Sequence, residues 1–219
     1  MFERKPSPAI LAIGGLMVLV GAVLILTGRV DYAAIVGGFV PMRIGLDPAL
    51  LVGAPPLVPV WLTPLTAALV HDGWLHLGFN LLSLLIVGTP TQRAVGLRGV
   101  IVLLVVGAYA AVAAQWAIDP RSPVPMVGAS GAISALIGAY ALLFGSGKAK
   151  AIGPVPAHVV HALWLGASWA ALNLVIAWTS AGSGMPVAGA AHIGGFLVGM
   201  LLVRPLLRWR WSTRLQSGR

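Results

Sequence analysis

The 219-residue chain contains no cysteine and only five acidic residues. Without cysteine it can form no disulfide, no thiolate metal site and no cysteine nucleophile. Charged residues of either sign make up 9% of the sequence, whereas hydrophobic residues make up 58% and the mean hydropathy is +0.95. A water-soluble domain of this length could not bury so much apolar surface. The composition therefore predicts an integral, multi-pass membrane protein whose first partner is the lipid bilayer.

Apolar runs of about 20 residues, enough to cross a hydrocarbon core of about 30 Å, mark the predicted spans. Six such runs occur, at residues 9–28, 74–90, 99–118, 127–145, 158–178 and 187–207. Residues 31–70 are also apolar but contain six prolines, and lipid cannot replace the hydrogen bonds that interior prolines remove. We therefore predict an all-α membrane protein, a bundle of six transmembrane helices with an interfacial loop between the first two.

Basic residues are divided unevenly between the two sides of the predicted bundle. If the N-terminus is cytoplasmic and the spans alternate, eleven Lys and Arg fall on the inner side and three on the outer side. Because cytoplasmic loops are enriched in basic residues, this division predicts cytoplasmic N- and C-termini. It also accounts for the net charge of +9 without a nucleic-acid partner. The predicted organisation is an N-terminus at 1–8, a membrane domain at 9–207 and a basic tail at 208–219.

Polar residues lie near the outer ends of three predicted spans: His76 and Asn80 in the second, Ser130 in the fourth and His192 in the sixth. At 1.5 Å per residue, Ser130 and His192 each lie on the order of 6–8 Å below the start of a helix, one turn or slightly more into it. No Asp or Glu lies within a span, so these residues indicate a Ser–His dyad rather than a triad. No His-Glu-x-x-His motif is present, and we expect neither a metal nor a cofactor.

Small residues recur every four positions on two of these spans. They are Gly131, Ala135 and Ala139 on the fourth span, and Ala191, Gly195 and Gly199 on the sixth. Such faces let helix backbones approach closely in lipid, although ordinary helix packing explains them equally well. If the two faces pack together, a hydrogen bond between Ser130 and His192 becomes available.

An oxyanion stabiliser is predicted beside the dyad. His76 and Asn80, four residues apart, lie on one helix face, and each can donate a hydrogen bond to developing negative charge. Gly128 and Gly131 flank Ser130 and permit close approach of the backbone to a substrate carbonyl. The Ser130 amide adds a donor. His71 is either a further contact for substrate or site water, or part of an interfacial turn.

Three motifs carry a family resemblance: HDGWLHLGFN at 71–80, GASG at 128–131, and AHIGG at 191–195 followed by Gly199. Their order and placement resemble the rhomboid intramembrane serine proteases. The resemblance implies that Ser130 is the nucleophile, His192 the general base, and His76, Asn80 and the Ser130 amide the oxyanion hole. It also implies an interfacial loop before the second span, a substrate gate at the fifth span with a cap in the loop that follows, and transmembrane helices as substrates.

The chain departs from the family pattern at three places. It has Trp61-Leu62-Thr63 where the family often has Trp-Arg, and Gln92-Arg93 where Glu-Arg is frequent. Ser134 stands where many members have an aromatic residue that packs on the histidine. The histidine must then be oriented by another group.

Three functions fit the pattern to different degrees. The first is an intramembrane serine endopeptidase. The second is a catalytically silent relative that binds transmembrane helices, which has no need to retain both Ser130 and His192. The third is a transporter or channel, which requires polar residues toward the inner side, where spans two, four and six turn apolar. Compact size and the absence of a targeting signal favour a bacterial plasma membrane as the location.

Overall fold

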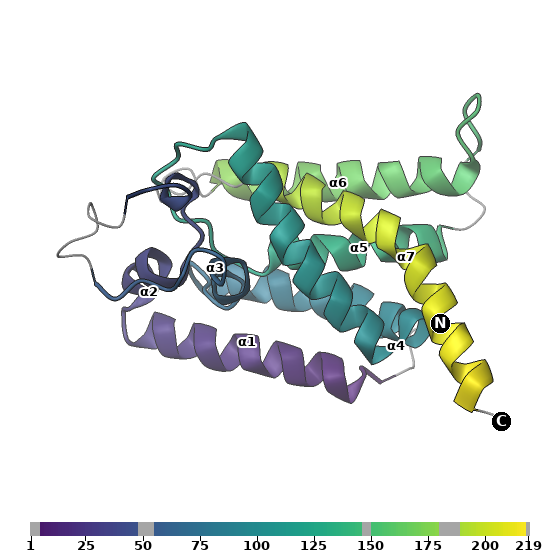
Figure 1. The fold of residues 1–219 in the computed structure, drawn as a ribbon, viewed down its shortest axis with the longest axis horizontal. Coiled ribbons are helices and arrows are strands. Elements are labelled where there is room, and N and C mark those ends of the chain that lie inside the picture. Colours follow the sequence, from purple (N-terminus) through teal and green to yellow (C-terminus); the bar gives the residue numbers. More distant parts are fainter. Residues whose placement is uncertain (1–4, 48–54, 146–149, 180–188, 218–219) are drawn as a thin grey trace.

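The structure is a computed structural model that describes residues 5–47, 55–145, 150–179 and 189–217 (Figure 1). These residues form a helical bundle. Its elements are α1 (Pro8–Leu26), α2 (Val30–Gly37), η1 (Pro41–Arg43), α3 (Thr63–Ala67), α4 (Trp74–Ile118), α5 (Ser130–Phe144), α6 (Ala157–Thr179) and α7 (Gly189–Ser217). By length and composition, α1, α4 and the Gly189–Ser212 part of α7 are each able to cross a membrane. The chain is thus an all-α membrane protein, as its composition predicts.

The longest helix, α4, contains two of the predicted spans. Gly96 interrupts it with φ 80° and ψ 171°, a backbone conformation that glycine adopts without steric cost. The segments predicted at 74–90 and 99–118 lie on either side of this break. Residues 189–207 of the span predicted at 187–207 lie within α7, which continues as a helix through Pro205 to Ser217, and residues 187 and 188 lie outside the described residues.

Three chain segments meet at the end of the bundle where α1 begins. The Ser7 hydroxyl donates a hydrogen bond to Gln92 Oε1 over 2.6 Å, and the Arg93 guanidinium donates to the Lys5 carbonyl over 3.1 Å. Arg210 of α7 donates to the carbonyls of Gln92 and Arg93. The Gln92 side chain therefore joins α1 to α4 by a neutral hydrogen bond.

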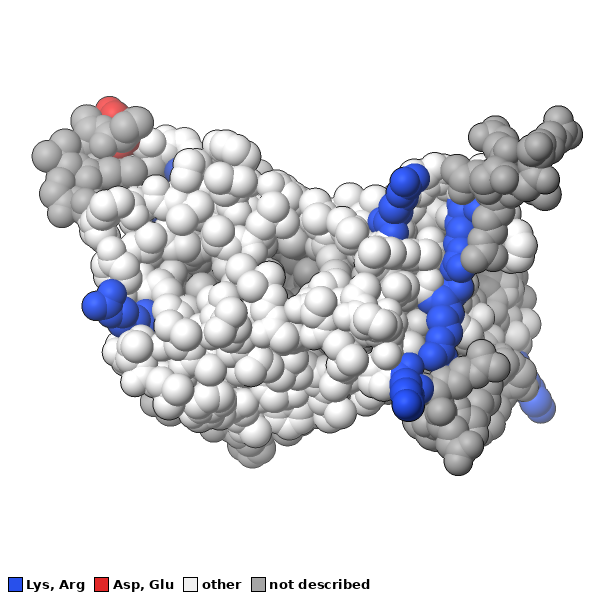
Figure 2. All heavy atoms as spheres, turned by 90° about the horizontal axis from the view of Figure 1, so that it is seen from below, with Lys and Arg blue, Asp and Glu red and all other residues white. Residues whose placement is uncertain are grey.

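On the face drawn in Figure 2, the charged side chains of the described residues lie toward the two ends of the molecule. Figure 2 shows Lys and Arg gathered mainly at the end where α1 begins and α7 finishes, with a smaller group at the opposite end. The broad middle of that face shows no charged side chain. An uncharged belt between two charged ends suits a bilayer, whose hydrocarbon core excludes unpaired charge.

The segment between α1 and α4 folds over the opposite end of the bundle. Its described residues, 27–47 and 55–73, contain the short elements α2, η1 and α3 and no helix long enough to span (Figure 1). Phe39 and Met126 exchange two backbone hydrogen bonds, of 3.0 and 2.8 Å. The Gly128 amide donates to the Ala67 carbonyl over 2.8 Å. These bonds fasten the segment to the chain that leads into α5.

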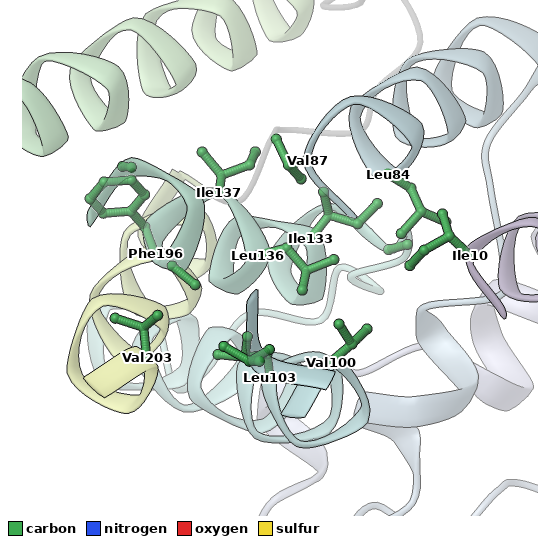
Figure 3. Packing of buried hydrophobic residues seen from close by; sticks show 14 of the residues in the cluster. Ile10, Leu84, Val87, Val100, Leu103, Ile133, Leu136, Ile137, Phe196 and Val203 are labelled. Atoms are coloured by element: carbon green, nitrogen blue, oxygen red, sulfur yellow. The ribbon is translucent and has the colours of Figure 1, made fainter. Parts of the chain in front are cut away.

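The core of the bundle is built around α5. Its residues from Gly131 to Ala139 are all buried, and Ile133 and Leu136 lie in one hydrophobic cluster with side chains of α4 and α7 (Figure 3). The contact between α5 and α7 is too close for larger side chains. A Cβ atom at Gly195 would collide with the Gly131 carbonyl oxygen, and one at Gly199 with the Ala135 carbonyl oxygen. This close approach brings the starts of α5 and α7 together.

Candidate active site

A serine and a histidine from different helices meet where α5 and α7 begin. Ser130 is the first residue of α5, and His192 lies three residues after the start of α7. His192 Nε2 lies 2.8 Å from Ser130 Oγ, and the histidine is only 5% exposed. A serine hydroxyl within hydrogen-bond reach of an imidazole is the arrangement of an activated nucleophile.

The helix that carries the serine begins later than the sequence predicts. The expected span starts at 127 and places Ser130 one turn inside it, whereas the structure starts α5 at Ser130 itself. The reason is Gly128, whose φ of 103° is incompatible with a helix. The placement of Ser130 one turn into a helix is therefore wrong, and the amides of Ser130 and Gly131 belong to the first turn of α5.

The N-terminus of α5 adds electrostatic character to the site. The first four amides of an α-helix have no carbonyl partner within the helix, and the helix dipole places partial positive charge there. Ala129, at the cap position, makes no side-chain capping hydrogen bond. Negative charge that develops on a group next to Ser130 would therefore meet backbone donors and a favourable dipole.

His76 lies directly against the backbone that precedes the serine. A Cβ atom on Gly128 would lie 2.5 Å from His76 Nε2. The Asp72 amide donates to His76 Nδ1 over 3.5 Å, which leaves the proton of the neutral ring on Nε2. His76 thus presents an N–H donor toward the Gly128–Ser130 segment.

Asn80 lies one turn further along α4 and is almost fully buried. Its Nδ2 donates to the His76 carbonyl over 3.0 Å, and its Oδ1 has no partner among the described residues. A side-chain amide carries two N–H donors, so one remains for a ligand. The same hydrogen bond fastens Asn80 to the turn of α4 that carries His76.

His71 supports His76 from behind. Its side chain is 0% exposed, its Nδ1 lies 3.3 Å from the Leu69 carbonyl oxygen, and its ring meets the His76 ring edge-on at 5.2 Å. Burial, and to a lesser extent the charge of nearby His76, lower the pKa of His71 from 6.5 to about 4. His71 is therefore folded into the structure as a neutral ring.

Because the His71 ring is buried in its neutral form, we expect the folded state to lose stability in acid. Because the folded-state pKa of His71 lies below its unfolded value, its contribution to stability is present above pH 6.5 and is lost as the pH falls toward about 4. Between about pH 7.5 and about pH 5, at 1.4 kcal/mol per unit of pKa, the loss is about 2 kcal/mol. Thermal unfolding in detergent micelles at the two pH values measures it.

His71→Gln is expected to flatten this pH dependence because glutamine does not titrate. The matched control is His161→Gln on α6, whose ring is only partly buried and which should unfold with the pH dependence of the wild type. Equal pH dependence in His71→Gln and the wild type would contradict the assignment.

A tryptophan that the sequence does not single out also contacts the site. Trp169 of α6 lies edge-on to His192, with ring centroids 6.2 Å apart, and its Nε1 donates to Ser134 Oγ over 2.8 Å. The sequence does not show which group orients the histidine, and nothing in the spacing points to residue 169. The only available signal is the absence of an aromatic residue at 134.

The structure thus brings Ser130, His192, His76 and Gly128 into one cluster, with His71 and Asn80 behind it. Gly131, Gly195 and Gly199 lie where α5 packs against its neighbours. The loop expected to form a cap, at 180–188, lies outside the described residues. Fold and cluster together define a membrane-embedded helical protein with a serine–histidine pair near one end.

Sequence comparisons agree with this class. The family profile described as Rhomboid domain matches residues 59–209. The chain is 31% identical over 137 residues to Rhomboid protease GlpG of Pectobacterium atrosepticum, covering 62% of this chain and 45% of the relative. It is 32% identical over 150 residues to Rhomboid protease GlpG of Serratia proteamaculans, covering 67% and 46%. It is also 30% identical over 143 residues to Rhomboid protein 1, mitochondrial, of Saccharomyces cerevisiae, covering 62% and 39%.

The chain belongs to the rhomboid family, since the family profile covers more than half of its length. It spans less than half the length of the curated relatives it matches.

Proposed function

We propose that the chain is an intramembrane serine endopeptidase that hydrolyses peptide bonds in or near the transmembrane segments of other membrane proteins. The observation that carries the proposal is the 2.8 Å contact between Ser130 Oγ and His192 Nε2. The two similar relatives named as rhomboid proteases support it.

The proposed reaction follows from the atoms at the site. His192 Nε2 accepts the Ser130 hydroxyl proton as Oγ attacks the scissile carbonyl carbon, and the carbonyl oxygen becomes an oxyanion. His192 then gives the proton to the departing amine, which leaves an ester on Ser130. Water attacks the ester with His192 again as base, and the carboxyl product leaves as His192 returns the proton to Ser130 Oγ.

Oxyanion stabilisation is assigned to three groups. His76 Nε2–H and the Ser130 amide both face the region before α5, and Asn80 has a free N–H one turn away. Preorganised donors of this kind are worth more in a site shielded from water than at an exposed surface. Because the donors come from α4 and α5, the position of one helix against the other sets their geometry.

The shortness of α5 supports a reaction within the membrane. Its 15 residues measure about 22 Å along the axis, less than the hydrocarbon core of about 30 Å. If the end of α5 at Phe144 reaches one interface, Ser130 lies below the opposite interface. Substrates are therefore proposed to be transmembrane helices that unwind near one membrane surface.

The proposed topology has six crossings. We assign them to α1, the two halves of α4 on either side of Gly96, α5, α6 and α7, with α2, η1 and α3 at the interface. The end with more Lys and Arg is assigned to the cytoplasm, which places both termini inside and the active site near the outer surface. A bacterial plasma membrane is the proposed location.

Labelling with a fluorophosphonate tests the proposal. The purified chain in detergent micelles is expected to acquire the probe covalently at Ser130, because the probe reacts with serine hydroxyls that a base activates. Ser130→Ala should show no labelling, whereas Ser83→Ala, which changes the serine of α4, should be labelled like the wild type. A folded wild-type chain that takes no label would overturn the proposal in favour of a silent helix-binding relative.

A further inference from the structure

Ser134 connects α6 to the turn of α5 that carries the proposed nucleophile. Its side chain is fully buried, and its hydroxyl donates to the Ser130 carbonyl over 2.7 Å. The same oxygen accepts the Trp169 Nε1 proton over 2.8 Å. The hydroxyl therefore donates to its own helix and accepts from an indole of another helix.

The fixed indole lies against the proposed general base. The rings of Trp169 and His192 meet at 69°, with centroids 6.2 Å apart. This is within the range in which aromatic rings attract edge to face. Contact with Ser130 constrains Nε2 of the imidazole, but Nδ1 is buried and has no hydrogen-bond partner among the described residues. Where a catalytic histidine has a third partner, that partner normally holds the side of the ring away from the serine.

We propose that Trp169 is a positioning residue that holds the His192 ring against Ser130, and that Ser134 fixes Trp169 in place. This inference rests on the proposed protease function. Trp169 acts by contact and orientation, and no proton passes through it. Because Trp169 stands on α6, the geometry of the dyad depends on α6 remaining against α5.

Kinetics of four variants in detergent micelles test the inference. Trp169→Ala is expected to lower kcat for a transmembrane substrate roughly three- to tenfold, the effect of losing one aromatic pair, with KM unchanged. Trp169→Phe keeps a ring beside His192 but loses the hydrogen bond, so we expect a smaller loss. Ser134→Ala should lower kcat less in the Trp169→Phe background than in the wild-type background, because the hydrogen bond to Trp169 is already absent there and only the bond to the Ser130 carbonyl is lost.

Trp209→Phe is the control because Trp209 lies on α7, 17 residues after His192, and is 43% exposed. It should leave kcat and KM unchanged. Independent effects of Ser134→Ala and Trp169→Phe, or a wild-type kcat in Trp169→Ala, would overturn the inference while the protease function remains.

A spectroscopic measurement tests the same inference without catalysis. In protein with isotope-labelled histidine, the ring resonances of His192 are expected to shift in Trp169→Ala but not in Trp209→Phe, because of these two only Trp169 lies against that ring. His192→Gln identifies the resonances by their loss. Unchanged His192 resonances in Trp169→Ala would overturn the inference even if the wild type cleaves no substrate.

Discussion

His192→Gln is expected to lower cleavage of a transmembrane substrate by about a thousandfold or more. Glutamine fills much of the space of the imidazole, but it cannot accept the proton of the Ser130 hydroxyl that lies 2.8 Å from Nε2. Ser130→Ala should lose activity to the same level. The measurement is the initial rate of cleavage in detergent micelles, with unfolding temperatures recorded alongside.

The double variant separates a dyad from two independent contributions. If Ser130 and His192 act as a unit, Ser130→Ala combined with His192→Gln should be no slower than either single variant. His158→Gln is the control, since His158 lies on α6 beside Arg204, within 3.2 Å of its guanidinium, and takes no part in the site. Losses that multiply in the double variant, or a wild-type rate in His192→Gln, would contradict the proposed roles.

Helix locations could be predicted from the sequence because hydropathy is a local property. The apolar runs at 9–28 and 158–178 differ from α1 and α6 by at most two residues at each end. Hydropathy does not mark where a helix stops, because arginine and tryptophan are accommodated in helices. For this reason the continuation of α7 from the apolar run to Ser217 was not predicted.

The start of α5 depends on backbone conformation, which composition does not reveal. Two glycines flank Ser130, and the sequence does not distinguish which of them leaves the helical region. The structure gives a φ of 103° to Gly128 and includes Gly131 in the helix. The hydrogen bond from the Gly128 amide to the Ala67 carbonyl favours this choice, and it joins residues 61 positions apart.

The departures from the family pattern are explained by contacts between distant residues. No arginine follows Trp61, but Arg43 donates a hydrogen bond of 2.6 Å to the Val58 carbonyl within the same interfacial segment. Serine replaces an aromatic residue at 134, but Trp169 of another helix lies beside His192. The sequence shows that a group is missing, whereas only the packing of helices shows which residue stands nearby.

Gly128→Ala is expected to lower cleavage by at least about a hundredfold while the helical bundle remains folded. Two effects combine at this position. Alanine at a φ of 103° costs about 1–3 kcal/mol of backbone strain, and its Cβ would lie 2.5 Å from His76 Nε2. Relief of both effects must move either the His76 donor or the backbone that positions Ser130. Cleavage rate and the unfolding temperature in micelles measure the two consequences separately.

Gly45→Ala separates backbone strain from displacement of the donor. Gly45 also has a positive φ, of 80°, but no atom lies within 4 Å of the position that a Cβ would take. This control should lose a similar amount of stability and retain its cleavage rate, because the strain is shared and the collision with His76 is not. If Gly128→Ala cleaves as fast as Gly45→Ala, the contact between His76 and the backbone before Ser130 does not position the oxyanion donor, and His76 loses its proposed role. If only Gly128→Ala is slow, catalysis requires the space that the missing side chain of Gly128 leaves for His76.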